Sequence, residues 1–264
     1  MCLILFAYRH HPRYRLIVAA NRDEFLDRPS APAAFWPEYP YLLGGKDLKS
    51  GGTWLGMTRT GRMAAVTNYR DPRSVMDGAP SRGHLVTHFL AGDESAHDYM
   101  TAVAKEAHRY NGFNLLADDH TDLYHFSNRN GVVTAVKPGI HGISNNLLNT
   151  PWPKLTRGKQ LFHTTLAQDG ENLQDALFRV LADNYRPNDA DLPDTGVGLE
   201  WERVLSTIFI NHRPVYATRS STVVMIDYEG IVTFRERTFN TSPETCEEAD
   251  YNFVIDETVN GTHQ

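Results

Sequence analysis

The second residue of the chain, Cys2, has the position and the chemistry of an N-terminal nucleophile. A small residue after Met1 generally allows the cell to remove that methionine, which would leave a thiol and a free α-amine on one residue. An α-amine titrates at about 7.7–8.0 and a free thiol at about 8.5, so the amine can serve as base for the thiol. The alternative is structural. Cys2 opens the apolar run Cys2–Tyr8, and a small apolar cysteine also suits the start of a buried strand.

The polar segment that follows should lie beside this cysteine. Two apolar runs, Cys2–Tyr8 and Leu16–Ala20, flank a polar segment that contains proline, and this pattern is typical of a β-hairpin. Antiparallel pairing across such a turn places Cys2 opposite Asn21, with a tolerance of one or two residues. The sequence therefore predicts that Asn21 and the charged residues after it surround the chain terminus.

Two of these charged residues suit supporting roles in catalysis. An arginine beside a thiol favours the thiolate, and we assign that role to Arg22. A carboxylate can accept hydrogen bonds from the α-amine and fix its orientation, which is the role expected of Asp23. The alternative is that residues 21–24 form an ordinary solvated turn that caps the next segment.

Hydrolysis of an amide also needs hydrogen-bond donors for the developing oxyanion. Asparagine side chains at strand ends can supply them, and Asn68 and Asn145 are the candidates. The alternative for each asparagine is turn chemistry. An arginine before a strand, Arg219, could bind a substrate carboxylate or form a surface ion pair. The candidate substrate-binding residues are Asn21, Trp54, Asn146 and Arg219.

The remaining motifs point away from metal and cofactor chemistry. His84 and His88 stand four residues apart on an expected helix, but no glutamate accompanies them as in His-Glu-x-x-His, and we interpret them as a solvated face. No Cys-x-x-Cys, phosphate-binding loop or dinucleotide fingerprint occurs. We predict no metal and no cofactor.

Composition limits the classes of function. The chain of 264 residues carries a net charge of -6 and no basic stripe, which argues against nucleic acid as a partner. No apolar run approaches the roughly 20 residues of a transmembrane segment. Charge follows the first apolar run, where a secretory signal has it first. The 2 cysteines are too few for a disulfide framework. We therefore expect a cytoplasmic protein, and no feature of the sequence specifies an oligomeric state.

The order of the expected elements predicts the fold class. Strands and pairs of helices follow one another without βαβ alternation, which argues against a parallel doubly wound sheet. An α+β fold, a four-layer α-β-β-α sandwich of two antiparallel sheets, accommodates the order in a single domain over residues 1–264. The expected helices cover residues 81–92, 94–109, 152–167 and 173–184. We expect loops at 28–41 and 185–199, a strand at 206–210 and a loosely held acidic tail at 242–264.

Several motifs occur in order along most of the chain, from Met1 to about Phe239. They are Ala20-Asn21-Arg22-Asp23-Glu24-Phe25, Arg28-Pro29, Gly51-Gly52-Thr53-Trp54-Leu55-Gly56, Ala65-Val66-Thr67-Asn68-Tyr69-Arg70, Ser81-Arg82-Gly83, Tyr110-Asn111-Gly112-Phe113-Asn114-Leu115, Ser144-Asn145-Asn146, Pro151-Trp152-Pro153-Lys154 and Thr218-Arg219-Ser220-Ser221. Together they resemble the NRDE family, the family of the transport and Golgi organisation proteins. That family looks like a branch of the N-terminal nucleophile hydrolases, akin to bile-salt hydrolases and penicillin V acylases.

The resemblance implies roles for the candidate residues. Cys2 matches the nucleophile of the hydrolases. Arg22 and Asp23 match an arginine and an aspartate at the end of the second strand, which the hydrolases separate by two residues whereas here they adjoin. Asn145 resembles the asparagine of the oxyanion hole, while Asn68 and Arg219 match more weakly.

The resemblance also implies two functions. The first is an N-terminal cysteine amidohydrolase that acts on linear C–N amide bonds of a small-molecule acyl-amide. The alternative is a non-catalytic haem- or acyl-lipid-handling protein of the transport and Golgi organisation type. Such a carrier would bind an apolar ligand in the same cleft, and the aromatic stretch 35–41 could line that cleft or pack in the core.

Overall fold

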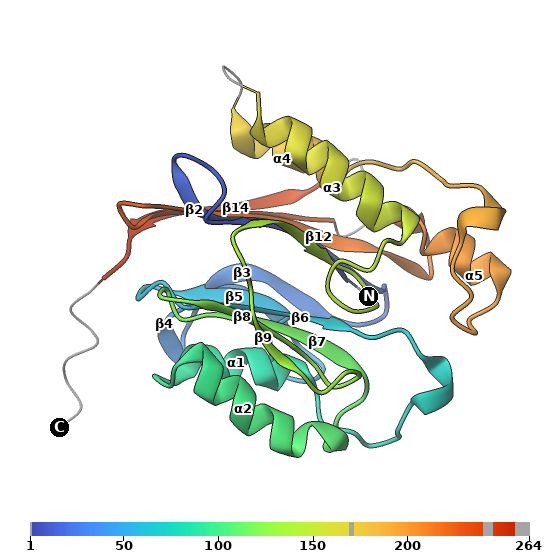
Figure 1. Cartoon of the computed structure of the whole chain (residues 1–264), viewed down its shortest axis with the longest axis horizontal. Coiled ribbons are helices and arrows are strands. Elements are labelled where there is room, and N and C mark those ends of the chain that lie inside the picture. The colour runs from blue at the N-terminus through green and yellow to red at the C-terminus, as the bar shows by residue number, and fades with distance from the viewer. Residues whose placement is uncertain (1, 169–171, 240–244, 257–264) are drawn as a thin grey trace.

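The protein is a sandwich of two antiparallel sheets with helices on both outer faces, as the sequence predicted (Figure 1). The computed structural model describes residues 2–168, 172–239 and 245–256. The first sheet has strand order β10-β1-β2-β12-β13-β14, with β11 paired to β12. The second has order β3-β4-β5-β6-β7-β8-β9. Helices α3 and α4 cover the first sheet, and α1 and α2 cover the second (Figure 1).

The bounds of these elements are as follows. The first sheet contains β1 (Cys2–Tyr8), β2 (Tyr14–Phe25), β10 (Gly139–Ile143), β11 (Asn211–His212), β12 (Tyr216–Asp227), β13 (Ile231–Thr238) and β14 (Glu247–Val254). The second contains β3 (Ser30–Trp36), β4 (Tyr39–Asp47), β5 (Leu55–Thr58), β6 (Met63–Asn68), β7 (Phe113–Asp118), β8 (Leu123–Ser127) and β9 (Val133–Ala135). The helices are α1 (Gly83–Ala91), α2 (Ala96–Glu106), α3 (Pro153–Leu166), α4 (Leu173–Leu181) and α5 (Leu199–Val204), with single 3₁₀ turns at Pro72–Ser74, Ala107–Arg109 and Asp189–Asp191.

The two cores follow from the period-two alternation of the central strands. In β1, Ile4 and Phe6 lie between the sheets, whereas Leu3 and Leu5 pack under α3 and α4. In β2 the even-numbered residues 16, 18 and 20 lie between the sheets, and residues 17 and 19 lie under the helices. This alternation decides which way each polar residue at the end of β2 points.

The hairpin of β1 and β2 has the predicted form. Cys2 pairs with Arg22, one residue from the predicted register and within its tolerance. Strand β2 continues to Phe25 because its other edge pairs with β12. A register shift between Thr218 and Ser220 interrupts that second ladder, which is where β-bulges redirect side chains near a site.

The segment expected as a loop over residues 28–41 is mostly strand. Strands β3 and β4 pair with each other, and β3 is the edge of its sheet. An edge strand tolerates Pro32, because one side of its backbone needs no ladder partner. The prolines of this segment are typical of loops, and this is why the sequence predicted a loop where the structure has an edge strand.

The second half of the chain departs from expectation in three places. Residues 206–210 form turns and bends instead of a strand. Helix α5 begins at the end of the expected loop 185–199. Residues 247–254 form β14, paired along its whole length with β13, where a loosely held tail was expected. Residues 242–244 and 257–264 of that tail lie outside the described residues.

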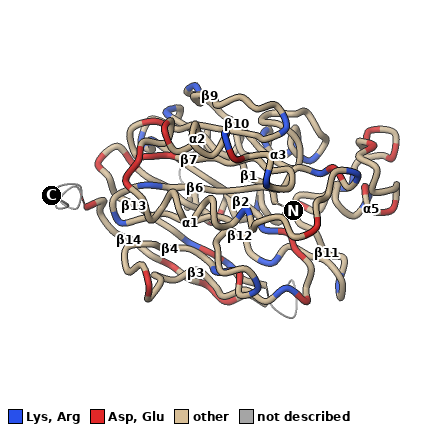
Figure 2. Tube along the Cα trace, turned by 90° about the horizontal axis from the view of Figure 1, so that it is seen from below, with Lys and Arg blue, Asp and Glu red and all other residues tan. Residues whose placement is uncertain are grey.

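Two surface properties bear on function. Among the described residues, no helix is long and apolar enough to cross a membrane. Figure 2 shows Lys and Arg interspersed with Asp and Glu along the trace, and the N-terminus at the same end of the molecule as α5.

Candidate active site

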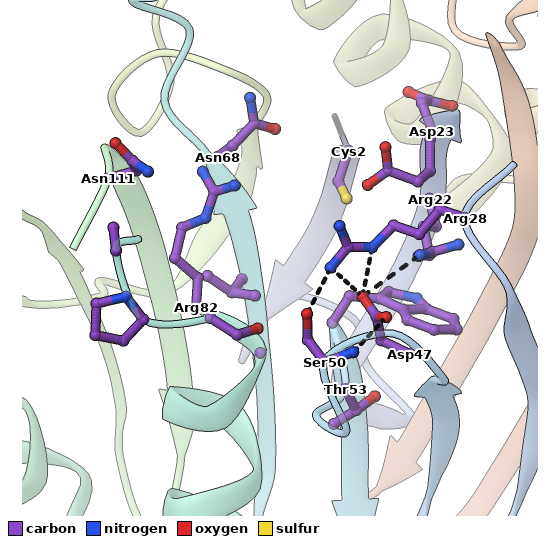
Figure 3. Close-up of a pocket in the computed structure, with 17 residues that line it drawn as sticks. Cys2, Arg22, Asp23, Arg28, Asp47, Ser50, Thr53, Asn68, Arg82 and Asn111 are labelled. Atoms are coloured by element: carbon purple, nitrogen blue, oxygen red, sulfur yellow. Dashed lines mark hydrogen bonds and ion pairs between the residues drawn. The ribbon is translucent and has the colours of Figure 1, made fainter. Parts of the chain in front are cut away.

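A polar cavity opens between the two sheets where β1 begins and where β2 and β6 end (Figure 3). Its volume is about 290 Å³. Cys2 stands on one wall, and Asn68 and Arg82 stand on the opposite wall (Figure 3). The predicted residues that line it are Cys2, Arg22, Asp23, Trp54 and Asn68. The fold thus gathers five of the nine candidates in one hollow.

The Cys2 side chain is partly buried and lies on the face of β1 that looks toward the second sheet, as do Ile4 and Phe6. Burial raises the pKa of its thiol, because a thiolate loses hydration there. The positive charge of Arg22 lowers that pKa, but burial is the larger effect. Burial of Cys2 therefore favours the thiol over the thiolate.

Arg22 is fixed on the same side of β2 by contacts with the second sheet. Its guanidinium carbon lies 4.5 Å from the centre of the Trp54 ring, a cation–π distance. Its Nη1 donates to Ser30 Oγ at 3.4 Å, and its Nη2 lies 4.0 Å from Asp47 Oδ2. Trp54 therefore acts on the site through Arg22 as well as through the cavity wall.

Sequence reasoning assigned no role to two further arginines of the cavity. Arg28 donates from Nε to Asp47 Oδ2 at 2.7 Å and from Nη2 to Ser50 Oγ at 3.0 Å (Figure 3). Arg82 donates from Nη1 to the Gly112 carbonyl at 3.0 Å. Both stand in motifs that carried the family resemblance. Their contacts depend on pairing between distant segments, so the motifs alone gave no chemical role.

Asp23 follows Arg22 in β2 and points the other way, toward the helices. It is buried, and its Oδ1 accepts a hydrogen bond from Thr218 Oγ1 at 2.7 Å. Its backbone carbonyl accepts one from Tyr216 Oη at 2.7 Å. Burial raises the pKa of Asp23, and the nearby Lys154 opposes that rise more than any other charge. Asp23 is therefore a buried carboxylate held by polar groups of β12 near the end of β2.

Asn68 and Asn145 share one hydrogen-bonded unit, but only Asn68 lines the cavity. The Asn145 amide donates from Nδ2 to both Oδ1 and the backbone carbonyl of Asn68, each at 3.1 Å. Because Oδ1 of Asn68 is an acceptor, its Nδ2 is the group left to donate, and it makes no hydrogen bond within the described residues. Asn145 thus holds the Asn68 side chain in place from outside the cavity.

The other three binding candidates lie outside the cavity. Asn21 points under the helices, where Nδ2 donates to the Leu181 and Ile208 carbonyls, each at 2.9 Å. Asn146 closes a local turn, with Oδ1 accepting from the backbone N–H of Leu147 at 2.7 Å. Arg219 donates to the backbone carbonyls of Phe25 and Arg28 at 3.1 and 2.9 Å. These residues hold the walls of the site in place.

A second, apolar cavity of about 640 Å³ adjoins the first. The two share Glu24, Asn68, Arg82 and Asn111 on their rims. Apolar side chains of the second cavity include Phe25, Tyr69, Val75 and Trp201. The aromatic stretch 35–41 lines neither cavity, and its Phe35 and Trp36 pack against the two hydrophobic cores.

The histidine pair on α1 has a structural explanation. His84 and His88 stack with ring centres 5.9 Å apart, and His84 Nε2 lies 2.6 Å from the Ser50 carbonyl. Within the described residues, no group of three or more His, Cys, Asp or Glu side chains could hold a metal ion.

Comparison with known proteins places this chain in a family. The family model described as Transport and Golgi organisation 2 matches residues 1–241. The chain is 40% identical over 275 residues to the Transport and Golgi organization 2 homolog of Mus musculus, covering 97% of this chain and 99% of that protein. The chain belongs to the Transport and Golgi organisation 2 family. The Drosophila melanogaster member is 28% identical over 264 residues, covering 90% of this chain and 92% of that protein.

A solved structure shares the fold of this family member. The mutant C2A conjugated bile acid hydrolase from Clostridium perfringens superposes with a TM-score of 0.51, covering 100% of this chain and 95% of that chain. The two sequences are 10% identical. This chain therefore shares the sandwich fold of that bile acid hydrolase, and the four-layer fold class matches the one that the sequence predicted.

Proposed function

We propose that this protein is an N-terminal cysteine amidohydrolase that cleaves linear C–N amide bonds of a small acyl-amide in the cytoplasm. The observation that carries the proposal is the place of Cys2 at the head of β1, in a polar cavity, with Arg22 directly opposite it. The likeness of the fold to a conjugated bile acid hydrolase supports the same reading of the cysteine.

The first half of the reaction requires a mature chain that starts at Cys2. The α-amine takes the thiol proton as the sulfur attacks the carbonyl carbon, and the carbonyl electron pair moves to oxygen. Burial raises the pKa of the thiol, so a base attached to the same residue supplies what the resting state lacks. Arg22 stabilises the developing thiolate, and Asp23 orients the α-amine from the helix side.

The second half releases the two products. The oxyanion receives a hydrogen bond from Nδ2 of Asn68, the free donor of the Asn68–Asn145 unit. Collapse of the intermediate breaks the C–N bond, and the ammonium of Cys2 passes its proton to the leaving nitrogen. Water then attacks the thioester and gives its proton to the α-amine. The acid leaves, and the thiol is restored.

The adjoining apolar cavity fits the acyl part of the substrate. Its volume of about 640 Å³ exceeds that of the polar cavity, about 290 Å³, which suits the smaller amine part. The shared residues Asn68 and Arg82 stand where the amide bond would pass from one cavity to the other.

The test combines mass spectrometry with hydrolysis of a panel of N-acyl amides. The intact mass should show loss of Met1, and the purified protein should cleave at least one acyl chain length. Cys2→Ala should lower turnover by about 10³-fold or more, because no other described side chain of the cavity is a comparable nucleophile. The matched control is Cys246→Ser, which removes the other cysteine, exposed and outside the cavity, and should leave turnover unchanged. Retained Met1, or equal turnover in Cys2→Ala, would contradict the proposal.

The apolar cavity also favours a second candidate, a carrier for an acyl lipid or haem. A carrier would bind a fluorescent fatty acid or haem with equal affinity in wild type and Cys2→Ala while neither protein hydrolysed the amide panel. Replacement of a wall residue of the apolar cavity, Val75→Glu, should weaken binding in that case. Hydrolysis that depends on Cys2 would exclude a purely passive carrier.

A further inference from the structure

Arg70 is a buried arginine that touches the Asn68–Asn145 unit and also the wall of the apolar cavity. It follows the end of β6 by two residues, and Asn68 is the last residue of that strand. Its backbone N–H donates to the carbonyl of Asn145 at 2.8 Å. Its guanidinium carbon lies 4.8 Å from the centre of the Trp152 ring, a cation–π distance. The proposed reaction gives this residue no role.

A buried ion pair holds one side of the Arg70 guanidinium. Nη1 donates to Glu202 Oε2 at 2.6 Å, and both side chains are 4% exposed. The other oxygen of Glu202 accepts from the backbone N–H and the hydroxyl of Thr195 at 2.9 and 2.5 Å. Glu202 belongs to α5, whose Trp201 lines the apolar cavity. Because both carboxylate oxygens are bonded, the guanidinium is fixed relative to that wall.

The other side of the guanidinium meets the side chain of Asn145. Arg70 Nη2 donates to Asn145 Oδ1 at 3.4 Å, a long hydrogen bond from a charged donor. The hydroxyl of Ser144 donates to the same oxygen at 3.2 Å. Arg70 can only donate, whereas a hydroxyl can also turn and accept. The Asn145 amide is therefore fixed from two sides, by Arg70 at its oxygen and by the Asn68 carbonyl at its nitrogen.

The orientation of the Asn145 amide decides which atom of Asn68 faces the cavity. With its nitrogen toward Asn68, Asn145 occupies Oδ1 of Asn68 and leaves Nδ2 to donate. The opposite orientation would place the Asn145 oxygen against two acceptors of Asn68. Asn68 would then turn its Nδ2 toward Asn145 and present an oxygen to the cavity.

We propose that Arg70 is a positioning residue that holds the Asn145 amide in the orientation that leaves the Asn68 donor facing the polar cavity. Glu202 holds Arg70 in turn, so α5 and the Asn68–Asn145 unit share one buried connection. The orienting role stands on the contacts of these residues alone. Its effect on turnover rests on the proposed function.

Exchange of side-chain amide protons with solvent tests the orienting role without any substrate. In protein labelled with nitrogen-15 at asparagine, the Asn145 amide should exchange slowly, because it is buried and bonded to Asn68. The variant Arg70→Met with Glu202→Gln removes both charges of the ion pair, so neither is left buried alone. Its Asn145 amide should exchange about tenfold faster or more. Asn145→Asp identifies the resonance, because that variant lacks it.

The matched control is a second buried ion pair, at the opposite end of β6 and β7. Arg15 Nη2 donates to Asp118 Oδ2 at 2.5 Å, and Asp118 pairs with Met63, the first residue of β6. Arg15→Met with Asp118→Asn removes this pair in the same way. Exchange of the Asn145 amide should stay at the wild-type rate in this control. Equal acceleration in both double variants would show a general loosening of the fold and would overturn the proposal.

Steady-state kinetics on the cleaved amide gives a second readout. In Arg70→Met with Glu202→Gln, kcat should fall about tenfold or more at nearly unchanged KM, because a misplaced oxyanion donor weakens the transition state and not the bound substrate. The Arg15→Met with Asp118→Asn control should keep the wild-type kcat. A higher KM with unchanged kcat would assign Arg70 to the wall of the apolar cavity alone and would overturn the proposal.

A charge-preserving variant covers the case in which the double variant does not fold. Arg70→Lys keeps a cation beside Glu202, but one nitrogen replaces the two that reach Glu202 and Asn145. The same faster exchange of the Asn145 amide is expected. Unchanged exchange in whichever variant folds would refute the orienting role. Retained Met1 or absent hydrolysis would refute the proposed function and leave the exchange experiment intact, so the two failures are distinguishable.

Discussion

At the scale of single residues, the adjacency of Arg22 and Asp23 is the feature that organises the site. Neighbouring residues of a strand point to opposite faces, so the two charges serve two different layers. Arg22 faces the second sheet and stacks on Trp54, whereas Asp23 faces the helices and Thr218. Cys2, opposite Arg22 at the start of β1, lies where both layers can act on it.

The division of labour between Asn68 and Asn145 gives a prediction at the same scale. Asn68→Asp keeps an oxygen that accepts the hydrogen bond from Asn145 but replaces the free Nδ2 donor with a second oxygen. The variant should fold normally, while kcat for amide hydrolysis falls by about 10²–10³, the usual cost of one oxyanion donor. Steady-state kinetics on the cleaved amide, with stability measured in parallel, checks this. Wild-type kcat in a stably folded Asn68→Asp protein would remove Asn68 from the oxyanion hole.

At the scale of elements, the sequence predicted the helices and the hairpin whose formation depends on residues close together in the chain. The first hairpin was predictable because two apolar runs around a polar turn segment fix the register within a few residues, and Cys2 and Arg22 therefore met as expected. Helices α1 to α4 lie close to their predicted ranges because the apolar stripe and its caps are local features.

Elements that depend on distant partners were missed. Strand β10 pairs with β1 from more than a hundred residues away and carries Asn145 to Asn68, and no local signal announces that pairing. Strand β14 alternates between exposed and partly buried residues. Its acidic residues are typical of a solvated tail, and only the fold shows that they pair with Arg235 and Arg237 on β13. The burial of Lys154 could also not be predicted from the sequence, because a lysine in the first turn of a helix is usually exposed.

The close packing of β4 against Trp54 gives a prediction at the element scale. A Cβ added at Gly45 would overlap the Trp54 ring, over which the Arg22 guanidinium also lies. Gly45→Ala should therefore lower the free energy of unfolding by about 1–3 kcal/mol, as overpacking does. Urea denaturation measures the change. In the Trp54→Ala background the same substitution should cost almost nothing, and an equal cost in both backgrounds would show that the ring is not the cause.

At the scale of the whole molecule, the two ends of the sandwich differ in how closely they are packed. The end with Cys2, Asp23 and Asn68 is hollow. At the opposite end the turns of the β5–β6 and β12–β13 hairpins meet Ile255, which is buried against Gly61 and Gly230. Strand β14, just before Ile255, packs across to β3 of the second sheet and so ties the two sheets together. Stability and catalysis should therefore be separable by position.

Two adjacent residues of β14, one packed inward and one exposed, test that separation. Phe253 packs against the core between the sheets, with its ring 6.0 Å from that of Phe35, whereas Val254 is 65% exposed. Phe253→Ala should lower the free energy of unfolding by about 2–3 kcal/mol, and Val254→Ala should change it by less than about 0.5 kcal/mol. Denaturant titration gives both values. Because the proposed catalytic residues lie at the other end, kcat per folded molecule should be the same in both variants. A fall in kcat for Phe253→Ala at temperatures where the protein stays folded would contradict this. It would show that the spacing of the sheets at the end with Ile255 controls the geometry around Cys2.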